Sequence, residues 1–173
     1  MKNKITLLAS LVFFIFCFII FFKSLNIPNL YIPQEISKKE LSTFDTKDFF
    51  TKEKISSEDI FVDSNFYILN IWSSWCAPCR EEHPKLMELS EKSSAKLIGL
   101  NYKDNYSDAI KFIKKFGNPY SKIIVDESGI ISIGLGAYGV PETYIISNEK
   151  KIIKKFIGPL SQKSINEISI ILK

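Results

Sequence analysis

Cysteine and histidine are scarce in this sequence, which has three cysteines and one histidine among its 173 residues. Structural zinc sites are four-coordinate and draw mainly on these two residue types. The spacing of Cys76, Cys79 and His83 offers three ligands, but Cys17 lies in an apolar segment and only a carboxylate is left as the fourth. We keep zinc as an alternative and predict that the chain binds neither metal nor cofactor.

An excess of basic charge is absent from most of the chain. The net charge is +4, with 23 basic and 19 acidic residues, but Lys2, Lys4 and Lys23 flank the first apolar segment. Removing these three leaves 20 basic against 19 acidic residues. This balance gives no electrostatic footprint for nucleic acid. A composition of 46% hydrophobic and 24% charged residues is typical of one globular domain with a short appendage.

Charged residues are also absent from Ile5–Phe22, a run of 18 residues rich in Phe, Ile and Leu. A helix of this length spans about 27 Å, close to the thickness of a bilayer core of about 30 Å. No small-x-small cleavage pattern follows, which favours a retained anchor over a cleaved signal peptide. Lys2 and Lys4 outweigh Lys23, so we expect the N-terminus in the cytoplasm and the rest of the chain outside.

The chain is expected to have three parts. These are a transmembrane anchor at 1–23, an extended tether at 24–40 that contains two prolines, and a folded domain at 41–173. Within the polar, mixed stretch 35–63 we expect short strands or turns.

Apolar patterning predicts an alternation of strands and helices after residue 65. The expected strands are Phe66–Trp72, Lys96–Asn101, Lys122–Val125, Thr143–Ser147 and Lys151–Ile157. The expected helices are about Pro78–Lys92, about Tyr106–Phe116, a short helix or turn at Gly129–Leu135, and a last helix after Gly158-Pro159. This order predicts an α/β fold with a central mixed β-sheet flanked by helices on both faces.

Cys76-Ala77-Pro78-Cys79 lies between a buried strand and the start of a helix. A disulfide there would close a very short loop and constrain the unfolded chain little, so a structural staple is not favoured. Unpaired N–H groups and the dipole at a helix N-terminus stabilise a thiolate, the attacking species in disulfide exchange. We therefore predict a redox-active pair, with Cys76 partly exposed at the helix start and Cys79 one turn in, facing the sheet.

The helix after the cysteines carries further candidates. Glu82 lies three residues past Cys79 and could point beneath the dithiol, where a carboxylate would oppose thiolate formation and move protons. Glu81 is expected only to complement the helix dipole. His83 is expected to be a helix-surface or packing residue rather than a catalytic base.

The WCAPC sequence after an apolar strand resembles the active-site motif of the thioredoxin superfamily. The finer pattern resembles the CcmG/DsbE thiol:disulfide interchange proteins of cytochrome c maturation. The matching stretches are LNIWSSWCAPCREEHP, IGLNYKDNYSDAIKFIKKFGNPY, GAYGVPETYII and FIGPL, in order across about Ile68–Leu160. The resemblance therefore implies a thioredoxin-like fold behind one N-terminal transmembrane helix.

The resemblance also implies roles for individual residues. Cys76 matches the nucleophile and Cys79 the resolving cysteine of a redox disulfide, and Trp75 matches the aromatic residue before the motif. Pro141 matches the cis-proline that faces the dithiol and, with Val140 before it, would bind substrate.

Two glutamates match the acidic residues near the dithiol in that family, Glu82 and Glu142. Asn70 occupies the place of a buried aspartate in thioredoxin itself. The proton-transfer role is therefore expected at Glu82 or Glu142.

The function that the resemblance implies is reduction of apocytochrome c, or of its mixed disulfide with a thiol protein of the maturation complex. Electrons would come from a membrane thiol-electron donor. We expect a monomer in the bacterial inner membrane, held by residues 5–22, with its catalytic domain in the periplasm. Two alternatives stay open: an anchored thioredoxin-like reductase of other extracytoplasmic proteins, and a non-redox peptide-binding module.

Overall fold

The computed structural model describes residues 2–26 and 39–172. The chain divides into two compact units, Met1–Glu35 and Ile36–Lys173. Most of the tether expected at 24–40 lies outside the described residues. At its two ends, the first helix continues to Asn26, and Glu40 forms an isolated antiparallel bridge with Lys151.

The first unit contains the helix α1, Lys2–Asn26. Among the described residues, its stretch Lys4–Lys23 is the one helical segment long and apolar enough to cross a membrane. The helix covers the predicted segment Ile5–Phe22 and extends beyond it at both ends. The absence of charge over this segment is what makes it a candidate span.

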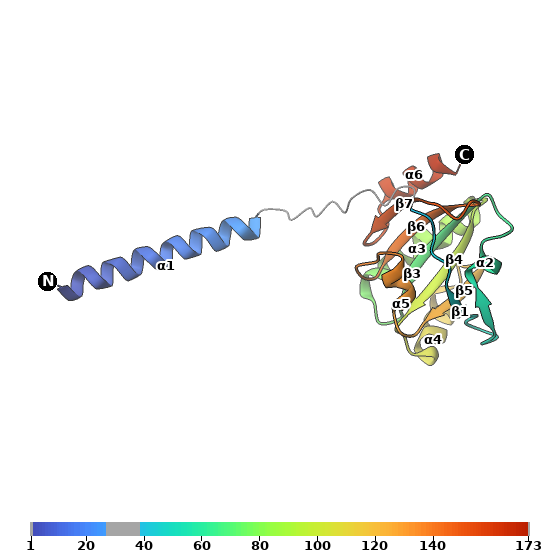
Figure 1. Ribbon diagram of the computed structural model, residues 1–173, viewed down its shortest axis with the longest axis horizontal. Helices are drawn as coiled ribbons and strands as arrows, with labels where there is room; N and C mark the ends of the chain where they lie inside the picture. Colours follow the sequence, from blue (N-terminus) through green and yellow to red (C-terminus); the bar gives the residue numbers. More distant parts are fainter. Residues whose placement is uncertain (1, 27–38, 173) are drawn as a thin grey trace. The chain divides into compact units, whose positions relative to one another are not determined.

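The second unit is built on a five-stranded mixed sheet (Figure 1). Its strand order is β5-β4-β3-β6-β7, in which β3 pairs in parallel with β4 and antiparallel with β6. The strands are β3 (Phe66–Trp72), β4 (Lys96–Tyr102), β5 (Lys122–Asp126), β6 (Glu142–Ser147) and β7 (Ile152–Ile157). The helices are α3 (Ala77–Lys92), α4 (Tyr106–Phe116), α5 (Ile130–Gly134) and α6 (Gln162–Ile171). The predicted α/β fold with a central mixed β-sheet is confirmed.

Apolar side chains cover both faces of the sheet. Successive residues of a strand point to opposite faces, so the continuous apolar run of β3 fills two separate clusters. Ile68 and Trp72 join residues of α3, α4 and α6 in one cluster. Leu69 and Ile71 join Ile60 and residues of the neighbouring strands in the other. Asn70 points to the same face as Ile68 and Trp72. Its polar side chain therefore lies on the face that α3 covers.

Local signals determine where the helices start and stop. The side chain of Asn105 caps the N-terminus of α4, and Gly117, at φ +91°, ends it. Both bounds of α4 agree with the sequence prediction. Ser161 and Ser164 form a capping box at the start of α6. The other predicted elements are found within one or two residues of their expected bounds.

The stretch before β3 is more ordered than its mixed sequence indicates. It forms a two-stranded antiparallel sheet, β1 (Asp45–Lys47) and β2 (Lys54–Ser56), followed by a helical turn α2 (Ser57–Ile60). The prediction of short strands holds, but the helical turn was not foreseen. Ser56 caps it by accepting a hydrogen bond from the Glu58 N–H. This polar contact does not appear in the spacing of apolar residues from which the helices are predicted.

Candidate active site

The two cysteines form a disulfide at the N-terminus of α3. Cys76 is the N-cap residue, and its Sγ accepts a hydrogen bond from the Cys79 N–H at 3.1 Å. Pro78 occupies the first turn, where a missing N–H costs nothing. The predicted position of the pair at the helix start is therefore found.

The expected exposure of Cys76 is wrong for this disulfide form, since only 3% of the residue is exposed. The bond turns its sulfur toward Cys79, which faces the sheet and is 2% exposed. Both cysteines belong to the apolar cluster of α3, α4 and α6. Opening the disulfide is therefore needed before Cys76 can present a free sulfur to a partner.

The turn before Cys76 is held by the segment after β4. The Ser74 N–H and hydroxyl donate to the two carboxylate oxygens of Asp104 at 2.5 and 2.6 Å. Trp75, which is 58% exposed, donates from Nε1 to the Lys103 carbonyl at 3.1 Å, and the Ser73 hydroxyl donates to the Tyr102 carbonyl. The NYKD sequence thus fixes the turn that presents Trp75 and Cys76.

Replacing Asp104 by alanine is expected to loosen this turn and to lower the free energy of unfolding by about 1–2 kcal/mol, because two donors of Ser74 lose their partner. Hydrogen exchange at the Ser74 amide measures the effect directly. Glu127→Ala, which removes an exposed ion pair with Lys47 and leaves the Ser74 contacts in place, is the control. Unchanged exchange at Ser74 in the Asp104 variant would contradict the assigned role.

A second loop, the one before β6, ends at the same end of β3. The Val140–Pro141 peptide bond is cis. Because Ile71 pairs with Glu142, Pro141 lies at the end of β3 from which the chain runs to Cys76. Val140 packs against the cluster that contains both cysteines. The structure thus places the predicted substrate-binding residues Val140 and Pro141 at the end of β3 after which α3 begins.

Glu82 is buried one turn beyond Cys79, on the same side of α3, and is 1% exposed. Its Oε1 accepts from Asn70 Nδ2 at 2.9 Å and its Oε2 from the Leu160 N–H at 2.9 Å. Burial raises the pKa of Glu82 to about 7, although both donors and the charge of Lys85 act to lower it. A carboxyl that titrates near neutral pH can both accept and release a proton.

Glu142 lies on the opposite face of the sheet. Its strand neighbour Thr143 accepts from Asn70, on the Glu82 side, so the Glu142 side chain points the other way. There Glu142 Oε2 lies 2.8 Å from Lys155 Nζ and accepts from the Tyr144 hydroxyl at 2.8 Å. The sequence motifs group the two glutamates near the dithiol, whereas the structure gives them separate environments.

Glu142 and its partner Lys155 also hydrogen-bond to the loop before Pro141. Glu142 Oε1 accepts from the Tyr138 N–H at 2.7 Å, and Lys155 donates to the Gly136 carbonyl at 2.7 Å. Lys155 Nζ lies 4.3 Å from the centre of the Tyr138 ring. The residue Tyr138 itself is 60% exposed. The buried ion pair therefore ties β6 and β7 to this loop.

His83 is a buried packing residue rather than a surface one. Its Nε2 lies 3.0 Å from the Gly117 carbonyl, and its ring meets Phe112 edge to face at 5.0 Å. Burial lowers the pKa of His83. Among residues 2–26 and 39–172, no group of three His, Cys, Asp or Glu side chains is placed to hold a metal ion.

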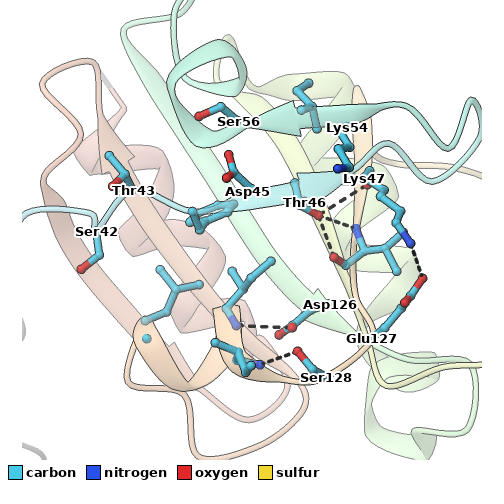
Figure 2. Close-up of a pocket in the computed structure, with 17 residues that line it drawn as sticks. Ser42, Thr43, Asp45, Thr46, Lys47, Lys54, Ser56, Asp126, Glu127 and Ser128 are labelled. Atoms are coloured by element: carbon cyan, nitrogen blue, oxygen red, sulfur yellow. Dashed lines mark hydrogen bonds and ion pairs between the residues drawn. The ribbon is translucent and has the colours of Figure 1, made fainter.

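A pocket of about 870 Å³ lies elsewhere in the domain, between the β1–β2 hairpin and α5 (Figure 2). The Thr46 hydroxyl donates to the Val125 carbonyl at its edge, and Asp126 accepts from the N–H and hydroxyl of Ser132. None of the predicted site residues lines this pocket. Two of its polar residues, Thr46 and Asp126, hold β1 and α5 in place through these hydrogen bonds.

The sequence predicts no role for Asp104, Tyr120 or Lys155. Asp104 and Tyr120 lie in the NYKD and GNPY stretches, which served only as markers of resemblance. Lys155 lies in a strand with three other lysines nearby, and nothing in that pattern distinguishes it from its exposed neighbour Lys154. Only the pairing of β6 with β7 brings it to Glu142.

A CxxC disulfide at a helix N-terminus, a cis-proline at the same end of β3 and a mixed five-stranded sheet define a protein of the thioredoxin-fold class. The Redoxin family model matches residues 38–171, and the chain belongs to this family. It is 37% identical over 109 residues to the thiol:disulfide interchange protein CycY of Rhizobium leguminosarum bv. viciae, covering 63% of this chain and 59% of that protein. It is 42% identical over 96 residues to the thiol:disulfide interchange protein DsbE of Pseudomonas aeruginosa, covering 56% and 53%.

These relatives confirm the resemblance to the DsbE proteins, although the matched region spans only a little over half of their length. The fold is also similar to the crystal structure of a secreted thiol-disulfide isomerase from Corynebacterium glutamicum. That match has a TM-score of 0.69 at 22% identity and covers 84% of this chain and 93% of the other. At this identity the likeness shows the fold alone.

Proposed function

We propose that this chain is a thiol:disulfide oxidoreductase that acts as a reductant in c-type cytochrome maturation. Its substrate would be the disulfide of apocytochrome c, or the mixed disulfide of apocytochrome c with a maturation protein. The observation that carries the proposal is the Cys76–Cys79 disulfide at the N-terminus of α3, with the cis Val140–Pro141 bond at the same end of β3. The similarity to DsbE and CycY proteins supports the choice of substrate.

The exchange proceeds in two steps. The Cys76 thiolate attacks one sulfur of the substrate disulfide, forms a mixed disulfide and releases the other sulfur as a thiolate. Cys79 then loses its proton and attacks the Cys76 sulfur, which restores the Cys76–Cys79 disulfide and releases the second substrate thiol. Two electrons pass to the substrate, and a membrane thiol-electron donor returns them. The buried Glu82 carboxyl is the acceptor proposed for the Cys79 proton.

The proposed location is the bacterial inner membrane, with α1 as a retained anchor and the redox domain in the periplasm. Support comes from the length and apolar composition of Lys4–Lys23 and from the basic residues before it. An anchored reductant would meet both a membrane electron donor and membrane-bound maturation proteins. The proposed working unit is a single copy of the chain.

The test uses a Cys79→Ala variant expressed with an affinity tag in its native cells. Without the resolving cysteine, the mixed disulfide on Cys76 is expected to accumulate. The trapped partners are identified by mass spectrometry after non-reducing purification. A Cys76→Ala, Cys79→Ala double variant keeps Cys17 and serves as the control for trapping by that residue.

Recovery of a c-type cytochrome or a maturation component from the single variant alone supports the proposal. If the trapped proteins are other extracytoplasmic proteins, the chain is a reductase of different substrates. If both variants recover the same proteins, the cysteine pair does not select them. The trapped species should also sediment with membranes, as an anchored chain requires.

A further inference from the structure

A chain of buried hydrogen bonds connects Tyr120 to Glu82. The Tyr120 hydroxyl donates to Asn70 Oδ1 at 2.8 Å. Asn70 Nδ2 in turn donates to Glu82 Oε1 at 2.9 Å and to Thr143 Oγ1 at 3.0 Å. The side chains of Asn70, Glu82 and Thr143 are almost completely buried, and Tyr120 is 5% exposed. Water therefore does not compete for these bonds.

The sheet leaves a defined place for the Tyr120 ring. Gly99 is the partner of Asn70 in the β3–β4 register. A Cβ atom at Gly99 would lie 2.9 Å from two atoms of the Tyr120 ring and 2.9 Å from Trp72 Nε1. The rings of Trp72 and Tyr120 stack with centres 5.7 Å apart and planes 19° apart. Because Gly99 has no Cβ, the Tyr120 ring can lie close against β4. In this position the Tyr120 hydroxyl reaches Asn70 Oδ1.

The Tyr120 hydroxyl decides which end of the Asn70 amide faces Glu82. An amide has an acceptor end and a donor end, and a carboxylate can only accept. While Oδ1 receives the Tyr120 hydroxyl, Nδ2 is directed to Glu82 and Thr143. Without that hydroxyl Oδ1 would be a buried acceptor with no donor, and the amide would gain by turning Oδ1 toward a protonated Glu82.

We propose that Tyr120 is a positioning residue for the Glu82 proton, acting through the orientation of the Asn70 amide. The use of that proton in resolving a mixed disulfide rests on the proposed function, but the positioning itself does not. In the intact protein the Asn70 donor stabilises the carboxylate form of Glu82. Tyr120 therefore controls how readily Glu82 gives up or takes a proton.

The groups that act on Glu82 come from several elements. On its own helix, Lys85 lowers its pKa, and Lys85 Nζ also donates to the Leu160 carbonyl at 2.6 Å. The Leu160 N–H comes from the loop before α6, and Asn70 comes from β3. Tyr120 lies before β5, and its own pKa is raised well above the ordinary value by burial and by the nearby Glu82. Tyr120 therefore stays neutral and acts as a donor.

The test is the substitution Tyr120→Phe in the full chain, held in detergent micelles. Carboxyl ¹³C NMR of glutamate-labelled protein follows the titration of Glu82, whose resonance is identified by its loss in Glu82→Gln. The midpoint in the intact protein is expected near 7. In Tyr120→Phe it is expected to rise by about one pH unit, because the turned Asn70 amide no longer donates from Nδ2 to the Glu82 carboxylate.

Tyr144→Phe is the matched control, since it also removes one buried tyrosine hydroxyl. That hydroxyl donates to Glu142, on the opposite face of the sheet from Glu82. It should leave the Glu82 midpoint unchanged. The proposal is overturned if Tyr120→Phe leaves the midpoint within about 0.2 pH unit of the intact protein, an interval well below the effect of one hydrogen bond. It is also overturned if both variants shift the midpoint equally, which would indicate general loosening of the core.

The outcome is independent of the trapping experiment, because the titration needs no substrate or electron donor. A failed trapping experiment with a shifted midpoint would reject the proposed substrate and keep the role of Tyr120. A successful trapping experiment with an unshifted midpoint would do the reverse.

Discussion

Replacing Lys155 by methionine is expected to lower the free energy of unfolding by about 3–5 kcal/mol, the cost of removing one partner of a buried ion pair. Only 6% of the Lys155 side chain and 1% of the Glu142 side chain are exposed. Methionine keeps much of the volume but leaves Glu142 without a counter-charge. It also removes the donor to the Gly136 carbonyl, so the loop before Pro141 loses its hydrogen bond to β7.

Urea unfolding monitored by tryptophan fluorescence measures this effect, since both tryptophans, Trp72 and Trp75, lie in the redox domain. Lys154→Met on the same strand is the control. Its pair with Glu167 is solvent-exposed and is expected to contribute less than about 1 kcal/mol. The double variant Lys155→Met, Glu142→Gln should recover part of the loss, because no buried charge remains. Equal losses at Lys154 and Lys155 would refute the account of a buried pair.

Replacing Glu82 by glutamine is expected to remove a pH dependence of stability worth about 3 kcal/mol, at 1.36 kcal/mol per pKa unit. The pKa of Glu82 is raised by burial from its ordinary value of 4.5 to about 7. Below pH 4.5 the carboxyl is protonated in the folded and the unfolded chain. Between pH 4.5 and about 7 only the folded chain keeps the proton, so the stability falls as the pH rises through this window.

Unfolding free energies measured from pH 4 to 8.5 in the disulfide form test this expectation. The stability of the intact protein relative to Glu82→Gln should fall by about 3 kcal/mol across that range and then level off. The exposed neighbour Glu81 provides the control, and Glu81→Gln should run parallel to the intact protein. Parallel curves for Glu82→Gln would mean that Glu82 is ionised in the folded state at pH 5.

The parts of the fold that the sequence predicts well are those with strong local signals. The apolar run of β3 and the amphipathic stripe of α4 gave both bounds of these elements. The CxxC spacing placed the dithiol at a helix start. These signals extend over a few consecutive residues, so no tertiary contact is needed to interpret them.

The polar contacts of the site could not be predicted in the same way. Tyr120 and Asn70 are 50 residues apart, and Lys155 reaches Glu142 only through a strand register that contains an irregularity at Ile145 and Ile146. The direction of each side chain depends on this register, because a shift by one residue reverses the face of a strand. The sequence motifs do not show on which face of the sheet a side chain lies. They therefore could not separate Glu82 from Glu142.

The central position of β3 also determines the order in which a newly made chain can assemble its reactive site. β3, β4 and β5 follow one another along the chain and can pair before the later strands exist. The second edge of β3 stays open until β6, which begins at Glu142, has been made. An open strand edge invites pairing with other chains. During synthesis the two cysteines therefore follow a strand whose second edge has no partner until the segment after Pro141 has been made.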